Sequence, residues 1–420
     1  MDDLSTTLKQ AIAEGSSIAA RFWLPDTADR VPGTLRWRPE SGADVDLIGP
    51  IGPLWPRDVA SHGSPVFGET VAGDLVALVD AWPSALPSVA PFPDVEMPWL
   101  RYRANTLAIG AHVRDDDRWS HAEYGTGALH AWMPHSGLSP VHADGDDPLN
   151  TMQVRWTRPP PRVVPLDGAT LTYHFLASRP WTYGPGFSIE TDVRAAVAVE
   201  EAQTARELRR NYGTPVECLM VLATGIPDRI SFEAVADAAE RRAVLVREGP
   251  LAVRLEWLRG RPPLFIAEDL PDFQSSLRGW FELYAKAGRA IGLFADSVCE
   301  GNVYSPSRLL TVYAALEGYQ RECVPGRDRL SRLCAHAGVD RALIGCSSAN
   351  IALLGAARAY HAHLRYDDAR FSVEQVEDGT FPSIRRATAL MQACLLRDIG
   401  FDVADTERRL AAHYAAWPIP

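Results

Sequence analysis

The chain has 420 residues, 46% of them hydrophobic and 23% charged, and its formal net charge is −11. This length exceeds one ordinary hydrophobic core, so two domains are expected, and the composition excludes a largely disordered chain. The negative charge argues against a general nucleic-acid coat protein, and without an apolar run of ~18 residues or a signal-peptide stretch we expect a cytoplasmic protein with no membrane association.

Residues from about 18 to 180 favour β-strands. Short alternating apolar runs are bounded there by turn residues, at IAARFWLP (18–25), GTLRWRP (33–39), DVDLIG (44–49), LVALVDAW (75–82) and LTYHFLA (171–177). Such runs predict a β-rich domain with antiparallel pairing. After a further strand-like stretch from 190, AQTARELRR (202–210) and VECLMVLAT (216–224) look helical.

The pattern changes near residue 270, within the Pro-rich stretch RPPLFIAEDLPD (261–272). Apolar spacings of three and four then predict amphipathic helices at 272–287, 306–323, 350–364, 382–399 and 403–415. We therefore expect an α+β protein with a β-rich domain at 1–270 and an all-α bundle at 271–420. The bases and acids balance from Trp280 onward, so the negative charge belongs to the first part.

The predicted helix at 350–364 carries the most suggestive polar pair, Arg358 and His363. At about 100° per residue the two lie about 140° apart, on the flanks of an apolar arc that should face the core. That arc contains Leu353, Leu354, Ala357, Tyr360 and Leu364. The opposite face is small, with Gly355, Ala359 and Ala362, and would let the same helix of a second copy approach closely.

This pair suits metal-independent cleavage of RNA. The 2′-hydroxyl is an internal nucleophile that needs a proton acceptor, and the leaving 5′-oxygen needs a proton donor. Histidine can serve in either role, and the guanidinium of Arg358 can offset charge on the phosphate. His361, three residues after Arg358, competes for the histidine role. The alternative is that Arg358 and His363 are a chance pair on a helix surface and have no catalytic role.

Glu317 lies on the apolar side of the helix predicted at 306–323. A buried carboxylate needs a partner, so we expect Glu317 to pair with Arg358 and fix its orientation. The alternative is a glutamate at the helix edge, in solvent. Cys323, Cys334, His336 and Cys346 fit no zinc spacing, and neither a metal nor a cofactor is expected.

The stretch from Ala357 to His363 resembles the Arg, four residues, His motif of HEPN domains, and is most similar to the ApeA-like branch. Segments in matching order resemble the same branch: Pro306–Arg321 with its Leu-Glu317, Leu390–Phe401 ending in Gly-Phe, and Trp280-Phe281. The first half resembles the ApeA N-terminal domain at Phe22–Pro25, Gly33–Leu35, Asp46–Gly49 and Leu129–Trp132. The resemblance covers nearly the whole chain.

The resemblance implies a bacterial anti-phage protein with an N-terminal sensor or regulatory domain that answers a phage-derived trigger. Its HEPN part would be a homodimeric or higher-order endoribonuclease, cleaving tRNA or other RNA by 2′-hydroxyl attack to leave 2′,3′-cyclic phosphate ends. Arg358 and His363 would form the catalytic pair, with Glu317 in support and His361 as a substitute.

One departure from the motif is Ala359, where the family has a polar residue after the arginine. It keeps open a catalytically silent HEPN scaffold that binds RNA or protein. A ligand-binding protein whose β domain holds the function is a second alternative.

Overall fold

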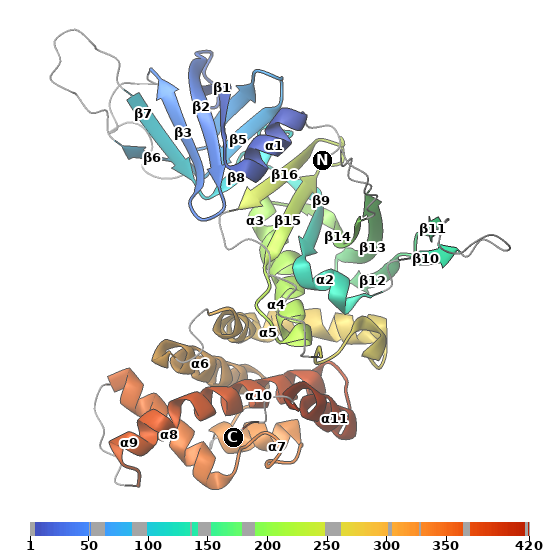
Figure 1. Cartoon of the computed structure of the whole chain (residues 1–420), viewed down its shortest axis with the longest axis vertical. Helices are drawn as coiled ribbons and strands as arrows, with labels where there is room; N and C mark the ends of the chain where they lie inside the picture. The colour runs from blue at the N-terminus through green and yellow to red at the C-terminus, as the bar shows by residue number, and fades with distance from the viewer. Residues whose placement is uncertain are drawn as a thin grey trace. The chain divides into compact units, whose positions relative to one another are not determined.

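The computed structural model describes residues 5–49, 51, 64–85, 99–134, 137–141, 153–178, 190–247, 262–300, 305–326, 329–363, 370–415 and 419 (Figure 1). The chain divides into two compact units that both use separate stretches of the sequence. The first contains 1–125, 196–209 and 230–252, and the second contains 126–195, 210–229 and 253–420. A division into contiguous domains at residue 270 stays a prediction.

The first unit is mainly an antiparallel sheet. Its elements are α1 (Thr6–Glu14), β1 (Ser17–Trp23), β2 (Val31–Arg38), β3 (Gly42–Ile48), β4 (Val66–Thr70), β5 (Leu75–Val79), β6 (Trp82–Ala85), β7 (Trp99–Ala104), β8 (Thr106–Ile109), β9 (Trp119–Thr126), α3 (Ala205–Leu208), β15 (Ile230–Ala236) and β16 (Arg242–Arg247). Antiparallel pairing follows the order β15-β16-β8-β5-β4-β1-β2-β3-β7-β6.

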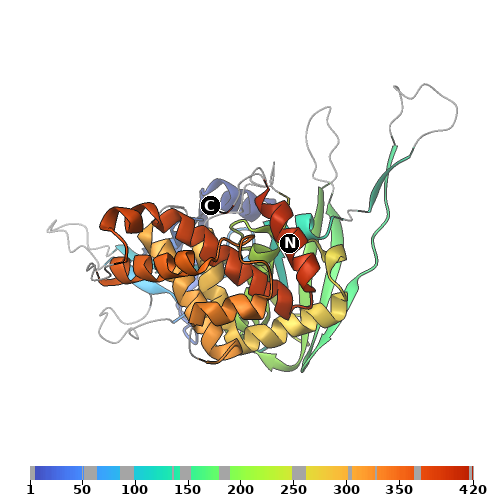
Figure 2. The ribbon, with the colours of Figure 1, turned by 90° about the horizontal axis from the view of Figure 1, so that it is seen from below.

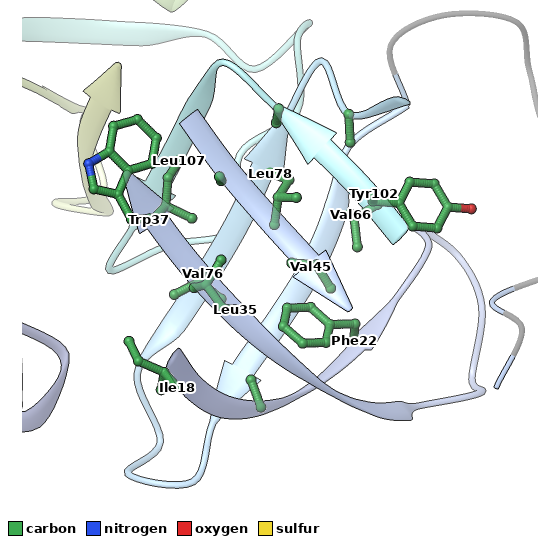
Figure 3. Packing of buried hydrophobic residues seen from close by; sticks show 14 of the residues in the cluster. Ile18, Phe22, Leu35, Trp37, Val45, Val66, Val76, Leu78, Tyr102 and Leu107 are labelled. Atoms are coloured by element: carbon green, nitrogen blue, oxygen red, sulfur yellow. The ribbon is translucent and has the colours of Figure 1, made fainter. Parts of the chain in front are cut away.

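Alternation of apolar and polar residues builds the core of this sheet. In β1, for example, Ile18, Ala20 and Phe22 are buried while the residues between them are exposed, as the period of two requires. The sheet curls, so that β3 approaches β8, and its inward side chains meet in one cluster (Figure 3). Gly68 is needed beside this cluster because a Cβ there would lie 2.8 Å from the Phe22 ring.

The second unit begins with strands and short helices. They are α2 (Gly127–Trp132), β10 (Leu138–Val141), β11 (Gln153–Trp156), β12 (Arg162–Leu166), β13 (Ala169–Ser178), the π-helix η1 (Arg209–Gly213), α4 (Thr214–Thr224) and the 3-10 turn η3 (Ala267–Asp269). The long strand β14 (Glu190–Gln203) belongs to the second unit up to Ala195 and to the first from Ala196. Nearly all of α4 is buried, which fits its apolar sequence.

The rest of the second unit is helical. Its helices are α5 (Phe273–Cys299), α6 (Pro306–Cys323), α7 (Arg329–Ala337), α8 (Ser348–His363), α9 (Val373–Asp378), α10 (Thr380–Asp398) and α11 (Val403–Tyr414). Most residues of α10 from Ser383 to Leu396 are buried, because α10 packs against α6, α7, α8 and α11 (Figures 1 and 2).

The α+β fold class is confirmed: a large antiparallel β region precedes an all-helical region. The helix expected at 306–323 has those bounds, and Ser305 caps it with its hydroxyl 3.2 Å from the Arg308 amide. The helix expected at 272–287 continues to Cys299, with a kink at Ala287 (φ −123°, ψ 20°). Helices α7 and α9 were not anticipated.

Candidate functional site

The helix that carries Arg358 is α8, and it lies on α6, α9 and α10. Ser347 caps its start, since the Ser347 hydroxyl accepts a hydrogen bond from the Asn350 amide at 3.2 Å. Of the apolar arc expected from the sequence, Leu354 and Ala357 are buried. Leu353 and Tyr360 are half-buried, and Leu364 lies outside the described residues. The described part of the arc therefore faces the core.

Arg358 and Glu317 are brought together, as expected for a carboxylate on the apolar side of a helix that needs a partner. Nη2 of Arg358 lies 3.9 Å from Oε2 of Glu317, and the two side chains are 37% and 20% exposed. The distance is that of a loose ion pair and exceeds a direct hydrogen bond. The guanidinium also lies 5.8 Å from the ring centroid of Tyr313, a cation–π distance. Since Tyr313 and Glu317 are one turn apart on α6, that helix provides both contacts.

His361 projects toward α10. Its Nε2 is 2.8 Å from the hydroxyl of Thr380, which in turn lies 3.0 Å from the Val376 carbonyl. A carbonyl only accepts, so both contacts are hydrogen bonds when Thr380 donates to Val376 and Nε2–H of His361 donates to Thr380. In that tautomer Nδ1 of His361 is a proton acceptor. Partial burial lowers the pKa of His361, which keeps its ring neutral at pH 7.

His363 is the last residue of α8 and is exposed. Within the described part of the chain, no hydrogen bond or ion pair joins His363 to Arg358. One copy of the chain thus holds Arg358 against Glu317 and His361 against Thr380, and leaves His363 directed to solvent.

The small face of α8 is uncovered among the described residues. A Cβ added at Gly355 would meet no atom within 4 Å, and Ala359 and Ala362 are exposed. Packing against the described residues of one copy therefore does not explain why these residues are small. The face lies beside Arg358 along the same helix, and a second helix could approach the backbone there.

Of the cysteine and histidine group, Cys323 lies on α6, Cys334 and His336 lie on α7, and Cys346 lies in the loop before α8. Cys334 and Cys346 are buried, whereas Cys323 is half-buried. His336 makes a hydrogen bond from Nε2 to Oδ1 of Asp398 at 2.9 Å.

Among the described residues, no helix combines the length and the apolarity required to cross a bilayer.

Sequence reasoning missed two side chains of this site. Tyr313 could have been found, because it precedes Glu317 by four residues and so lies on the same side of α6. Thr380 could not, because its contact with His361 depends on how α8 and α10 pack.

Comparison with known proteins gives one match. A family described as ApeA N-terminal domain 1 matches residues 17–230, just over half of the chain. The match ends at the first residue of β15, in the first unit, and does not include the helices from α5 to α11. No curated protein and no solved structure matches significantly.

Proposed function

Because the chain belongs to the ApeA N-terminal domain 1 family and is an ApeA-like anti-phage protein, we propose that its helical region is a HEPN-type endoribonuclease. The observation that carries the proposal is the position of Arg358, which Glu317 holds 3.9 Å away on α6 at the edge of an uncovered face of α8. A guanidinium so held is available to a phosphate. The substrate is tRNA or other cellular RNA, and the activity belongs in the bacterial cytoplasm.

The proposed reaction is a transesterification. A histidine accepts the proton of the 2′-hydroxyl, whose oxygen attacks the adjacent phosphorus and forms the 2′,3′-cyclic phosphate. The bond from phosphorus to the 5′-oxygen breaks, and a second group, which acts as an acid, donates a proton to that oxygen. Arg358 offsets the charge that develops on the phosphoryl oxygens. His363 is the proposed proton carrier, and Nδ1 of His361 is the substitute.

The uncovered face of α8 supports a homodimer. Two such faces packed together would place two Arg358 side chains and two His363 side chains around one cleft, which offers the proton donor and acceptor that a single His363 does not. Gly355→Leu should then give a monomer in sedimentation velocity, since a Cβ at this position meets no atom of the described residues within 4 Å. Ala412→Leu, at an exposed position of α11, is the control that should leave the dimer intact. A dimer that survives Gly355→Leu contradicts this interface.

The test of the activity is incubation of the purified full chain with total tRNA in EDTA. We expect fragments whose 3′ ends resist ligation until the cyclic phosphate is removed. Arg358→Ala and His363→Ala should abolish them, whereas His361→Ala should not. Arg408→Ala, an exposed arginine of α11, is the matched control. Cleavage that persists undiminished in Arg358→Ala would refute the proposal.

Two observations favour a second candidate, a silent HEPN scaffold that binds RNA or protein. Ala359 offers no polar group beside Arg358, and His363 has no contact with Arg358 among the described residues. The scaffold predicts that tRNA binds, that binding weakens in Arg358→Ala, and that the RNA stays intact under every condition that activates the defence.

A further inference from the structure

A cavity of about 1010 Å³ lies in the second unit, away from the candidate site. Three segments enclose it: the β12–β13 turn at Leu166 and Asp167, the π-helix η1, and one face of α5 from Arg278 to Asp296. Neither Arg358 nor Glu317 lines it. Its volume is at the upper end of the range of small-molecule pockets, so a ligand larger than an ion fits.

The lining is rich in bases, although the chain as a whole is acidic. Arg210, Arg278, Lys286 and Arg289 all line the cavity. Lys286 and Arg289 are exposed, and within the described residues neither has a hydrogen bond or an ion pair. Three acids, Asp167, Glu282 and Asp296, also line the cavity, so the four bases leave one net positive charge. Asp296 is paired with Arg229 at 2.9 Å. Cationic side chains without protein partners favour an anionic ligand.

Aromatic rings line the same space. Tyr212 is buried behind the half-buried Phe281, with ring centroids 6.3 Å apart. Tyr284 is one turn further along α5, and its ring lies across Gly288, where an added Cβ would approach it to 2.9 Å. Gly288 therefore allows Tyr284 to lie close against the helix. Exposed edges and faces of such rings stack with planar heterocycles.

The backbone is irregular on both sides of the cavity. Arg210, Asn211 and Tyr212 belong to a π-helical turn, and Ala287 interrupts the α-helical geometry of α5 between Lys286 and Gly288. π-helical turns are rare and occur frequently at functional sites. Gly292, next along the wall, leaves open space at its Cβ position, so the groove continues past the kink.

From this combination we propose that the cavity binds a mononucleotide, with its base against Phe281 and Tyr284 and its phosphates at Lys286 and Arg289. The chemistry requires both parts of the ligand, a planar ring and a polyanion. The site is independent of the proposed cleavage site, and α5, which forms its wall, packs along α6, the helix that carries Glu317.

The proposal is tested by calorimetric titration of the full chain with ATP and GTP, and with adenosine and inorganic pyrophosphate as the two halves. We expect at least one nucleotide to bind about tenfold more tightly than either half. Lys286→Gln with Arg289→Gln should weaken that binding by about tenfold or more. Gly292→Leu should also weaken it, because the new side chain enters the groove.

Arg408→Gln, a charge loss at an exposed position of α11, should leave the affinity unchanged, and circular dichroism of each variant checks that it is folded. Dissociation constants weaker than about 1 mM for all nucleotides, or equal affinity in the wild type and the double variant, would overturn the proposal. Binding of a uridine hexanucleotide without binding of any mononucleotide would assign the groove to an RNA strand and overturn it as well.

Discussion

The carboxylate of Glu317 lies too far from Arg358 for a short hydrogen bond, yet near enough to attract the guanidinium. We therefore propose that Glu317 orients the guanidinium of Arg358. Glu317→Gln keeps the shape of the side chain and removes the charge, and we expect cleavage of tRNA to slow by about tenfold, or about 1.4 kcal/mol. The single-turnover rate is the measurement.

Glu322→Gln is the matched control, because Glu322 is an exposed glutamate of the same helix. It should cleave at the wild-type rate. If Glu317→Ala cleaved at the full rate with unchanged stability, Glu317 would have no part in the site, and the solvent-edge interpretation of this residue would hold.

Asp228 gives a prediction about stability. It is fully buried, and burial raises its pKa from 3.8 to about 6, against hydrogen bonds from Thr126 and the Ala128 amide that lower it. The folded state thus holds the proton more tightly than the unfolded state, so stability falls as the pH rises from 3.8 to about 6. Above that window the buried charge costs up to about 3 kcal/mol.

Asp228→Asn removes this charge while keeping an acceptor for the Ala128 amide. The variant should be more stable than the wild type at pH 7.5 in urea unfolding, and the difference should shrink as the pH approaches 4. Asp29→Asn, at an exposed position, should show no such trend. An Asp228→Asn protein that is less stable at pH 7.5 would mean that the ionised carboxylate is compensated in the fold.

At the scale of the element, substitutions at two glycines of α5 can distinguish the effect of helix propensity on stability from the effect of packing. Replacing glycine by alanine inside a helix stabilises it by about 1 kcal/mol when the methyl group has room. Gly292 has that room, whereas the methyl group at Gly288 would lie 2.9 Å from the Tyr284 ring. Gly292→Ala should therefore raise the unfolding free energy by about 1 kcal/mol, and Gly288→Ala should gain less or lose stability. Equal gains would show that Tyr284 moves aside freely.

The same glycines explain an error in the expected elements. The helix expected to end at residue 287 continues to Cys299 because Ile291, Phe294, Ala295 and Val298 are buried, and this tertiary burial outweighs the weak propensity of Gly288 and Gly292. By contrast, α6 was predicted with its observed bounds because Ser305 and Pro306 mark its start locally. Short α7 and α9 were missed although each has a local signal. In α7, Leu330, Leu333, Cys334 and Ala337 are buried at helical spacings of three and four, and α9 begins with a capping box of Ser372 and Gln375.

At the scale of the whole molecule, helical periodicity placed Glu317 on the apolar side of its helix and Arg358 on the flank of another, and a buried carboxylate's need for a partner then predicted that the two meet. It could not place His361 against Thr380 or assemble the cavity beside η1. Those contacts join segments that the sequence separates, such as Asp167, Arg210 and Lys286, and only the packing of the second unit brings them together.

Contacts within the second unit also predict which truncated fragments of the chain are stable. The helices from α5 onward depend on residues before 271: the Trp280 indole is buried and donates to the Pro215 carbonyl at 2.9 Å, and Asp269 pairs with Arg409 at 2.8 Å. Phe265 is buried with its ring centroid 5.4 Å from that of Phe401. A fragment 271–420 loses all of these contacts, and a fragment 262–420 keeps those of Phe265 and Asp269.

We expect 262–420 to be more stable than 271–420 by about 3 kcal/mol, the typical cost of losing a buried phenylalanine, and both to be less stable than the full chain. Urea unfolding followed by tryptophan fluorescence measures this, because Trp280 is common to both fragments. Equal midpoints would mean that residues 262–270 contribute nothing to the helical core. If the difference is found, the regulatory role expected for the N-terminal region has to be tested with point variants in the full chain, since a deletion to residue 270 would disturb the fold that holds Arg358.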